Sequence, residues 1–403
     1  MGRSIPLSDV DGEMIHVEVV NSLDWISKLP NDLLLKVLSK LSMEEVLRTS
    51  VLSKRWVDVW KETSHLYLDM RRIAKAKILL PEVSHQAARS IIKDHRGHLE
   101  RCTIYHDSLQ CEDGVFESWI QSLVNVKHIK HLKLVNLFDH FEPITGSHVT
   151  LDLPPKSFSH PDLISLFLDE YNLETPHAFY SCRSLKDLSL INVSAETEVF
   201  NAVLVSCPSL EVLALKISCH KKGFLKIENH NLKFLFLSCL GIKGINVSSP
   251  NLDILSIEYL SYLTNAKEAE MLRQVLAAWP VEMGELEIVS KSNNDAIKES
   301  ESSIGKTRNT IWEETKPFPN AEFRVYTVWL SNFSGSEEEF ALASRVITHG
   351  TVIWNMKIRP SSSSTTKKSE IKAAIAKLKE LPKCHNYFRI TCSDEALVEP
   401  SLW

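Results

Sequence analysis

The sequence is poor in glycine, has no excess of basic residues and has no long hydrophobic run. Its 403 residues include 12 glycines, about 3% of the chain against an average near 7%, so a glycine-rich phosphate loop is not expected. Against 51 Asp and Glu there are 46 Lys and Arg, giving a net charge of -5. This balance offers no basic patch, so we expect neither nucleic acid nor a membrane surface as a partner. The sequence has no run of about 18 apolar residues, which is the length that would predict a membrane span.

The N-terminus and the cysteines indicate a reducing compartment. Residues 1–22 carry four acidic residues and no continuous apolar segment, which predicts a flexible N-terminus and no signal peptide. The eight cysteines include no C-x-x-C pair, so we expect free thiols without a disulfide framework. Both observations favour the cytoplasm or the nucleus.

The sequence shows no complete motif for catalysis, metal binding or cofactor binding. Residues 302–307 resemble the end of a P-loop, but Ser300 stands where the first glycine is required. Two histidine pairs are three residues apart, His95 with His98 and His128 with His131. Neither pair has cysteines or carboxylates at metal-site spacing, so we interpret them as surface histidines. Cys384 and His385 are adjacent and should face opposite ways on a strand. We therefore predict no catalytic residue, no metal and no cofactor.

Residues 24–69 carry the densest local signal. Pro30 suits a helix start, and Ser42 with Glu45 forms a capping-box pattern that predicts a second helix from residue 43. Trp56 and Trp60 lie four apart on a third short helix. Three such helices bury too little apolar surface to be stable alone, so this segment needs a partner.

In order and spacing this segment resembles the F-box. The resemblance rests on Leu-Pro-Asn-Asp-Leu-Leu at 29–34 and Ser-Lys-Arg-Trp at 53–56, with aliphatic residues at helical spacing between them. It implies docking to a Skp-family adaptor of a cullin-RING ubiquitin ligase, the SCF complex. The implied adaptor contacts are Leu29, Pro30, Leu34, Leu38, Leu41, Leu47 and Val51. Trp56 and Trp60 could equally belong to the internal core. The alternative to an F-box is that the segment forms three ordinary core helices of a larger domain.

A leucine pattern recurs after residue 99. The clearest copies of L-x-x-L-x-L start at Leu163, Leu185, Leu210, Leu232 and Leu252, which are 22, 25, 22 and 20 residues apart. Looser copies start at Leu99, Ile129 and Met283. Such periods predict a leucine-rich solenoid in which each repeat adds one strand to a parallel sheet. A helix is expected in the return segment 193–210, capped by Ser194. The repeats resemble those of plant-type F-box/leucine-rich-repeat proteins.

Strand alternation predicts which residues line the open face of this sheet. The leucines point inward, so the central open column should be Lys133, Phe167, Ser189, Ala214, Phe236, Ser256 and Glu287, with Phe234 beside Phe236. A face of this length suits a protein or peptide, and aromatic side chains often anchor one. We therefore assign Phe167, Phe234 and Phe236 to target binding. Alternatively, a loop or the C-terminal region covers them.

The C-terminal part alternates strands and helices. Residues 291–320 are polar and read as a linker or long loop. Strands are expected at 322–330, 351–360 and 386–392, and helices at 336–348 and 369–381. The order of these elements resembles the FBD module of many plant F-box proteins, and it would cap the solenoid.

The predicted fold is an α/β solenoid with a three-helix F-box, a leucine-rich-repeat horseshoe with a parallel sheet, and a C-terminal α/β cap. The expected segments are a flexible N-terminus (1–22), the F-box (23–69), the repeats (70–290), the linker (291–320) and the FBD-like cap (321–403). The expected function is a non-catalytic substrate receptor of an SCF ligase. The alternative is a receptor in which a small molecule helps the repeat face bind its target.

Overall fold

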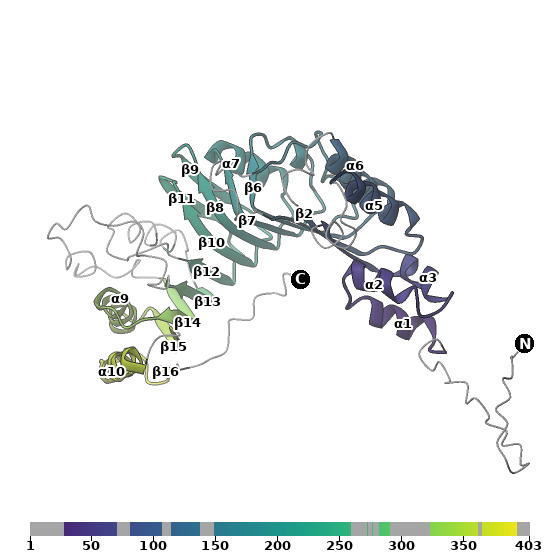
Figure 1. Ribbon diagram of the computed structural model, residues 1–403. Helices are drawn as coiled ribbons and strands as arrows, with labels where there is room; N and C mark the ends of the chain where they lie inside the picture. The colour runs from purple at the N-terminus through teal and green to yellow at the C-terminus, as the bar shows by residue number, and fades with distance from the viewer. Residues whose placement is uncertain are drawn as a thin grey trace, which may run out of the picture.

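The computed structural model describes most of the chain. The described residues are 28–70, 81–106, 114–137, 149–258, 272, 276, 282–290, 323–361 and 365–392. The predicted flexible N-terminus and polar linker lie outside them. Figure 1 shows an arch with short helices at its N-terminal end, a curved sheet along its length and two helices at its C-terminal end.

Short helices form the N-terminal end. They are α1 (Asn31–Leu38), α2 (Met43–Thr49), α3 (Trp56–Val59) and the 3-10 turn η1 (Trp60–Glu62). The predicted capping box is confirmed at the start of α2. The Glu45 N–H donates to Ser42 Oγ at 3.4 Å, and the Ser42 N–H donates to Glu45 Oε2 at 2.8 Å. Two amides at the helix start, which lack partners within the helix, are thus paired.

One parallel sheet runs through the described chain. Its path is β1 (His65–Asp69), β2 (Arg101–His106), β3 (His131–Asn136), β5 (Ser165–Asp169), β7 (Asp187–Ala195), β8 (Val212–Cys219), β10 (Phe234–Leu240), β12 (Ile254–Glu258), β13 (Glu282–Val289), β14 (Arg324–Phe333), β15 (Val352–Pro360) and β16 (Arg389–Cys392). Two short strands, β4 (Val149–Thr150) and β6 (Tyr171–Leu173), pair beside β7. Parallel neighbours in chain order require a return segment after each strand, so the fold is an α/β solenoid.

The leucines of the repeats form the interior. In the five clearest repeats all three pattern positions are buried; Leu188, Leu213 and Leu235, for example, are at most 1% exposed. Alternate side chains of a strand face opposite ways, so each strand sends its leucines to one side of the sheet. Burial of a leucine contributes roughly 1.5–3 kcal/mol, and the stacked repeats share one continuous apolar core.

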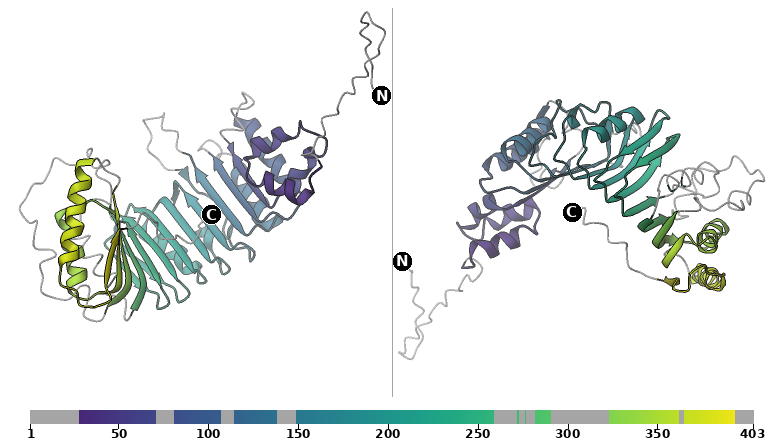
Figure 2. Two further views of the ribbon diagram at one scale, coloured as in Figure 1. Left: turned by 90° about the horizontal axis from the view of Figure 1, so that it is seen from below. Right: turned by 180° about the vertical axis from the view of Figure 1, so that it is seen from behind.

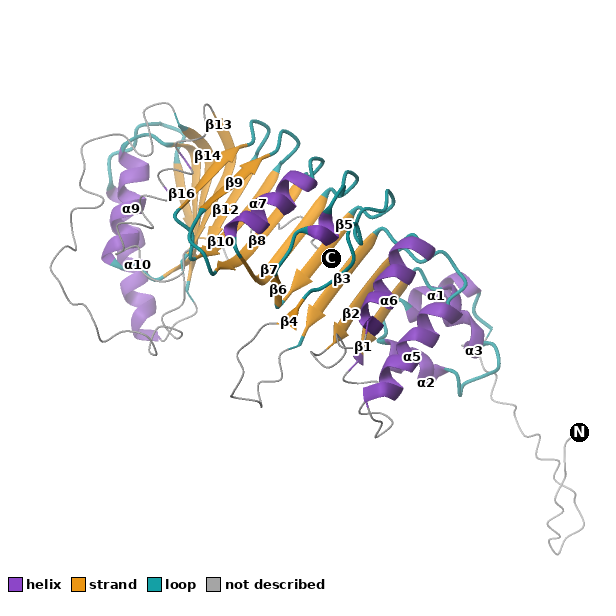
Figure 3. Ribbon diagram, turned by 90° about the horizontal axis from the view of Figure 1, so that it is seen from above, coloured by secondary structure: helices purple, strands orange, loops and turns teal. Residues whose placement is uncertain are grey.

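Return segments cover the outer side of the arch (Figures 1 and 3). They include α5 (Pro81–Asp94), α6 (Val115–Gln121), the π-helical turn η3 (Ser122–Val126), the 3-10 turn η4 (His177–Phe179), α7 (Thr197–Ser206), and a small sheet of β9 (Phe224–Glu228) and β11 (Gly244–Ser248). The predicted helix in 193–210 is present, but the Ser194 cap is wrong. Strand β7 extends to Ala195, and the Ser194 hydroxyl donates to Asn172 Oδ1 at 3.2 Å.

The C-terminal part continues the same sheet. Strand β13 pairs with β14, β14 with β15 and β15 with β16, all in parallel. Helices α9 (Glu337–Thr348) and α10 (Thr365–Glu380) pack together on the outer side (Figure 2). The predicted alternation of helices and strands is confirmed. Among the described residues, none of the helices combines the length and apolarity that crossing a membrane requires.

We expect replacement of Gly241 by alanine to destabilise the chain. Gly241 has φ +73°, and an added Cβ would lie 2.2 Å from the backbone oxygen of Cys219. The left-handed backbone costs an alanine about 1–2 kcal/mol, and the overlap adds to it. Urea unfolding should therefore show a loss of about 2 kcal/mol or more. Gly114→Ala is the matched control, because Gly114 has φ +68° with nothing within 4 Å. Equal losses for both variants would contradict the predicted overlap.

Candidate functional site: two interaction surfaces

The helical opening contains the predicted adaptor contacts. Pro30, Leu47 and Val51 are exposed, whereas Leu29 and Leu41 are half-buried against the core. Leu34 and Leu38 require a correction. They are 0% and 1% exposed and lie in the interior, so their side chains offer no surface to a partner. Helix α1 is amphipathic, and this pair lies on its inward stripe.

Other apolar side chains of this region are exposed and were not predicted. They are Leu33, Val37, Leu52 and Val57. With Leu47 and Val51 they form what we call the F-box face. Val51 is 87% exposed. Six exposed apolar side chains within one short segment are typical of an interaction site. Trp56 and Trp60 are buried, which decides the open alternative in favour of internal core.

The inner side of the arch presents the open sheet face. The strand register places the seven predicted residues in one column in the predicted order. The column extends further in both directions. The added members are Tyr67 and Thr103 before Lys133, and Trp329, Lys357 and Thr391 after Glu287. We call this surface the concave face.

The phenylalanines predicted to bind a target have different surroundings. Phe167 and Phe236 are half-buried. Phe234 is 3% exposed, so its assignment as an exposed anchor is wrong. It forms a small cluster with Trp329, with Phe236 and Ile254 packed against it. The alternative that the C-terminal region covers an open-face phenylalanine therefore holds for Phe234.

A lysine above an aromatic ring marks the N-terminal half of the concave face. Lys133 Nζ lies 4.2 Å from the centroid of the Phe167 ring, a cation–π contact. Burial lowers the pKa of Lys133, because the charged ammonium loses water. Burial also raises the pKa of Asp169 nearby, against a hydrogen bond from Asn192 that lowers it. This part of the face thus combines an aromatic ring with half-buried charges.

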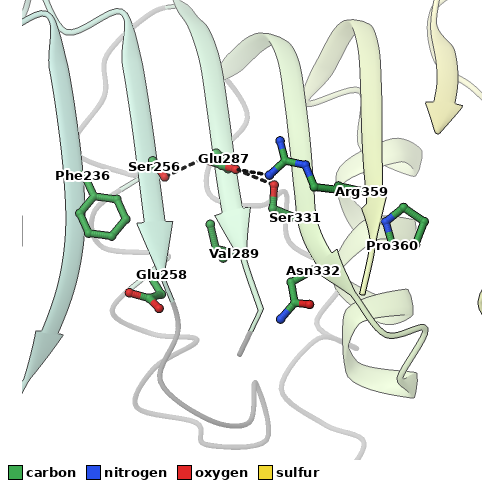
Figure 4. A pocket seen from close by; sticks show the side chains of 9 residues that line it. All are labelled: Phe236, Ser256, Glu258, Glu287, Val289, Ser331, Asn332, Arg359 and Pro360. Atoms are coloured by element: carbon green, nitrogen blue, oxygen red, sulfur yellow. Dashed lines mark hydrogen bonds and ion pairs between the residues drawn. The ribbon is translucent and has the colours of Figure 1, made fainter. Parts of the chain in front are cut away.

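A pocket of about 460 Å³ is hollowed into the C-terminal half of the concave face (Figure 4). At its centre Glu287, 7% exposed, accepts hydrogen bonds from two hydroxyls. Ser256 donates to Oε2 at 2.8 Å and Ser331 donates to Oε1 at 2.5 Å. Arg359 lies 3.8 Å from the same carboxylate and is partly exposed. A buried carboxylate is tolerable because these groups offset its lost hydration.

The lining of the pocket mixes apolar and polar side chains, and Trp329 and Lys357 follow Glu287 in the same column of the sheet. Phe236 forms one side (Figure 4). Lys357 Nζ lies 4.1 Å above the Trp329 ring, and the Trp329 Nε1–H donates to Glu285 Oε2 at 3.0 Å. Phe236 and the partly exposed Arg359, which both line the pocket, can contact a peptide side chain and its polar groups. Trp329 was missed because it belongs to the predicted cap, and only the register shows that it joins the column.

The histidine and cysteine candidates have structural contacts. His95 is 1% exposed and not a surface histidine, since its Nε2–H donates to the Thr63 carbonyl oxygen at 2.6 Å. The Cys384 thiol donates to the Thr348 carbonyl oxygen at 3.0 Å, and His385 contacts the Gly350 carbonyl oxygen at 3.4 Å. These contacts hold the turn between α9 and β15.

Comparison with known proteins connects both surfaces to a family. A sequence model of the F-box domain matches residues 26–65, and one described as "FBD-associated F-box protein At5g56370, LRR repeats" matches residues 116–287. Putative F-box protein At1g67390 of Arabidopsis thaliana is 37% identical over 96% of this chain and 94% of its own length. F-box protein At1g80960 of the same organism is 39% identical over 91% and 90%.

More distant relatives carry the other parts of the architecture in their names. Putative F-box/FBD/LRR-repeat protein At3g49030 of Arabidopsis thaliana is 26% identical over 86% of this chain and 76% of its own length. The F-box match covers the helical opening, and the repeat match covers most of the strands that form the concave face. The chain therefore belongs to the plant F-box/leucine-rich-repeat proteins.

Proposed function

We propose that the chain is the substrate-recognition subunit of an SCF-type cullin-RING ubiquitin ligase. F-box proteins with leucine-rich repeats typically serve as substrate receptors of such ligases. In this proposal helices α1 to α3 form the three-helix F-box, the F-box face binds a Skp-family adaptor, and the horseshoe of repeats binds a target protein. The chain contributes positioning and no catalytic residue, because a ligase bound through the adaptor transfers ubiquitin.

The observation that carries the proposal is the match of residues 26–65 to the F-box, together with the exposed apolar side chains that this segment presents. The concave face supports the second half. Its pocket combines Phe236, a paired carboxylate and Arg359 on a surface long enough for a peptide. The small-molecule alternative is not proposed, because the central carboxylate of the pocket is already paired with groups of the chain.

Target capture tests the role of the concave face. We expect Phe236→Ala combined with Arg359→Ala to lower recovery of target proteins about 10-fold or more, since each side chain lines the pocket. The measurement is quantitative mass spectrometry of proteins captured by the full chain from plant cells treated with a proteasome inhibitor. Phe224→Ala is the control, because Phe224 is 50% exposed on β9, at the outer side. Unchanged recovery, with equal adaptor in both samples, would place the target elsewhere.

We also propose that the chain works in the cytoplasm or the nucleus. The described cysteines support this, because all seven are free thiols and four of them are buried in the core. Burial raises the pKa of Cys102, which keeps the thiol protonated and unreactive. A fluorescent fusion found in the secretory pathway would contradict the proposal.

A further inference from the structure

Two histidines and an aspartate from neighbouring repeats meet at one edge of the solenoid. His128 lies in the loop before β3, while His160 and Asp162 lie in the loop before β5. His128 Nδ1 is 2.8 Å from His160 Nε2, and the two rings are 4.5 Å apart between centroids. Asp162 Oδ2 is 3.9 Å from His128 Nδ1 and 3.7 Å from His160 Nδ1. One ligand atom from each residue lies within 4.8 Å of those of the other two.

The stacking of the repeats brings these residues together. Strands β3 and β5 are parallel neighbours, so the loops that enter them lie side by side at the same edge. Ile129 and Leu163 are buried and anchor the two loops. His128 and Asp162 each immediately precede such an anchor, which puts them at equivalent positions of adjacent repeats.

The short contact between the two imidazoles needs a proton or an ion between them. Both nitrogens carry a lone pair when unprotonated, so at 2.8 Å one ring must donate an N–H to the other. The Asp162 backbone N–H donates to His160 Nδ1 at 3.3 Å, which leaves Nε2 of His160 as the donor. A cation placed between the rings would accept both lone pairs and also attract the carboxylate.

We propose that His128, His160 and Asp162 bind a divalent transition-metal ion, with Zn²⁺ as the best fit and water as its fourth ligand. Zinc takes imidazole and carboxylate ligands at about 2.0–2.2 Å in tetrahedral geometry, so its ligand atoms lie about 3.3 Å apart. The observed separations of 2.8 and 3.9 Å from His128 Nδ1 bracket that value. Shifts of the exposed His128 and Asp162 side chains would bring the three ligand atoms, which lie within 4.8 Å of one another, onto one ion.

The ligand chemistry decides the class of ion. Two imidazoles favour zinc and its transition-metal neighbours over Mg²⁺ and Ca²⁺, which prefer oxygen ligands. His128 and Asp162 are about half exposed, so an ion and its water ligand can reach the site. His160 is 18% exposed and forms the more fixed wall. Bound metal would link two adjacent repeats by three ligands.

The test is titration of the full, untagged chain with Zn²⁺ in a calorimeter. We expect one ion per chain, and at least a 10-fold weaker affinity for His160→Ala and for His128→Asn. Asparagine is chosen because His128 has φ 54°, a backbone region that asparagine tolerates. His220→Ala is the control, since His220 is exposed and lies outside the cluster. Mg²⁺ should give no heat of binding.

A second measurement tests the proposal on the wild-type chain, so it does not depend on the folding of a variant. X-ray absorption of the zinc-loaded wild-type chain should show two imidazole ligands and oxygen ligands near 2.0–2.2 Å. Absence of a one-to-one zinc complex in the wild-type chain would overturn the site. So would a zinc complex of unchanged affinity in both folded ligand variants.

Discussion

Replacing Leu47 and Val51 with aspartate is expected to abolish co-purification with a Skp-family adaptor. Both side chains are exposed, four residues apart on one side of α2 and the turn after it. If they anchor the adaptor, each charge would be buried unpaired at the interface, and affinity should fall about 100-fold or more. Because both positions are exposed in the free chain, its free energy of unfolding should change by about 1 kcal/mol or less.

The matched control for this result is Val205→Asp. Val205 is 81% exposed on α7, so it receives the same charge on the outer side of the repeats. We expect it to bind the adaptor like the wild-type chain in a titration by biolayer interferometry. If the double variant still binds the adaptor as tightly as the control, the F-box face is not the docking surface.

Replacing Trp329 with alanine is expected to loosen the C-terminal part of the sheet. Trp329 is 4% exposed and forms the cluster with Phe234 on the concave face. Removal of a buried tryptophan costs about 3–5 kcal/mol. Since stability in a solenoid is carried by contacts between neighbours, the loss should be concentrated in β10 to β16, which include the strands of the cluster. Hydrogen exchange should therefore speed up in those strands and stay slow in β2 to β7.

Trp329→Phe separates packing from hydrogen bonding. It keeps an aromatic ring but removes the N–H that donates to Glu285 at 3.0 Å. We expect a cost of about 1 kcal/mol. A loss of exchange protection spread evenly over the whole sheet in Trp329→Ala would contradict the nearest-neighbour account.

The repeats could be read from the sequence because their leucines recur at fixed spacing. Alternation along each strand then gave the order of the open column from Lys133 to Glu287, and the register agrees. Burial of Phe234 could not be read in this way. It depends on Trp329, which lies three strands along the sheet path and 95 residues away along the chain. Alternation assigns a face to each residue, but it does not say which side chains meet there.

The N-terminal helices show a second limit. Helix α1 carries three leucines in a row at 33–35, so periodicity alone could not decide whether Leu34 or Leu33 faces outward. The cluster of His128, His160 and Asp162 was missed for a related reason. Its members are 32 and 34 residues apart, and the return segments of this solenoid differ in length. Only the stacked structure shows which loops become neighbours.

Backbone hydrogen bonds join the helical opening to the start of the sheet, and the number of strands sets the distance from there to the pocket. The Lys61 carbonyl oxygen accepts from the Arg96 and Gly97 amides at 2.7 and 2.9 Å, and β1 begins three residues after η1 ends. From β1 to β13, which carries Glu287, the sheet takes eight steps of about 4.8 Å, or about 38 Å. The number of repeats therefore sets the distance between the F-box face and the pocket. Adding or removing one repeat would move the pocket by one strand spacing and change the direction in which it opens.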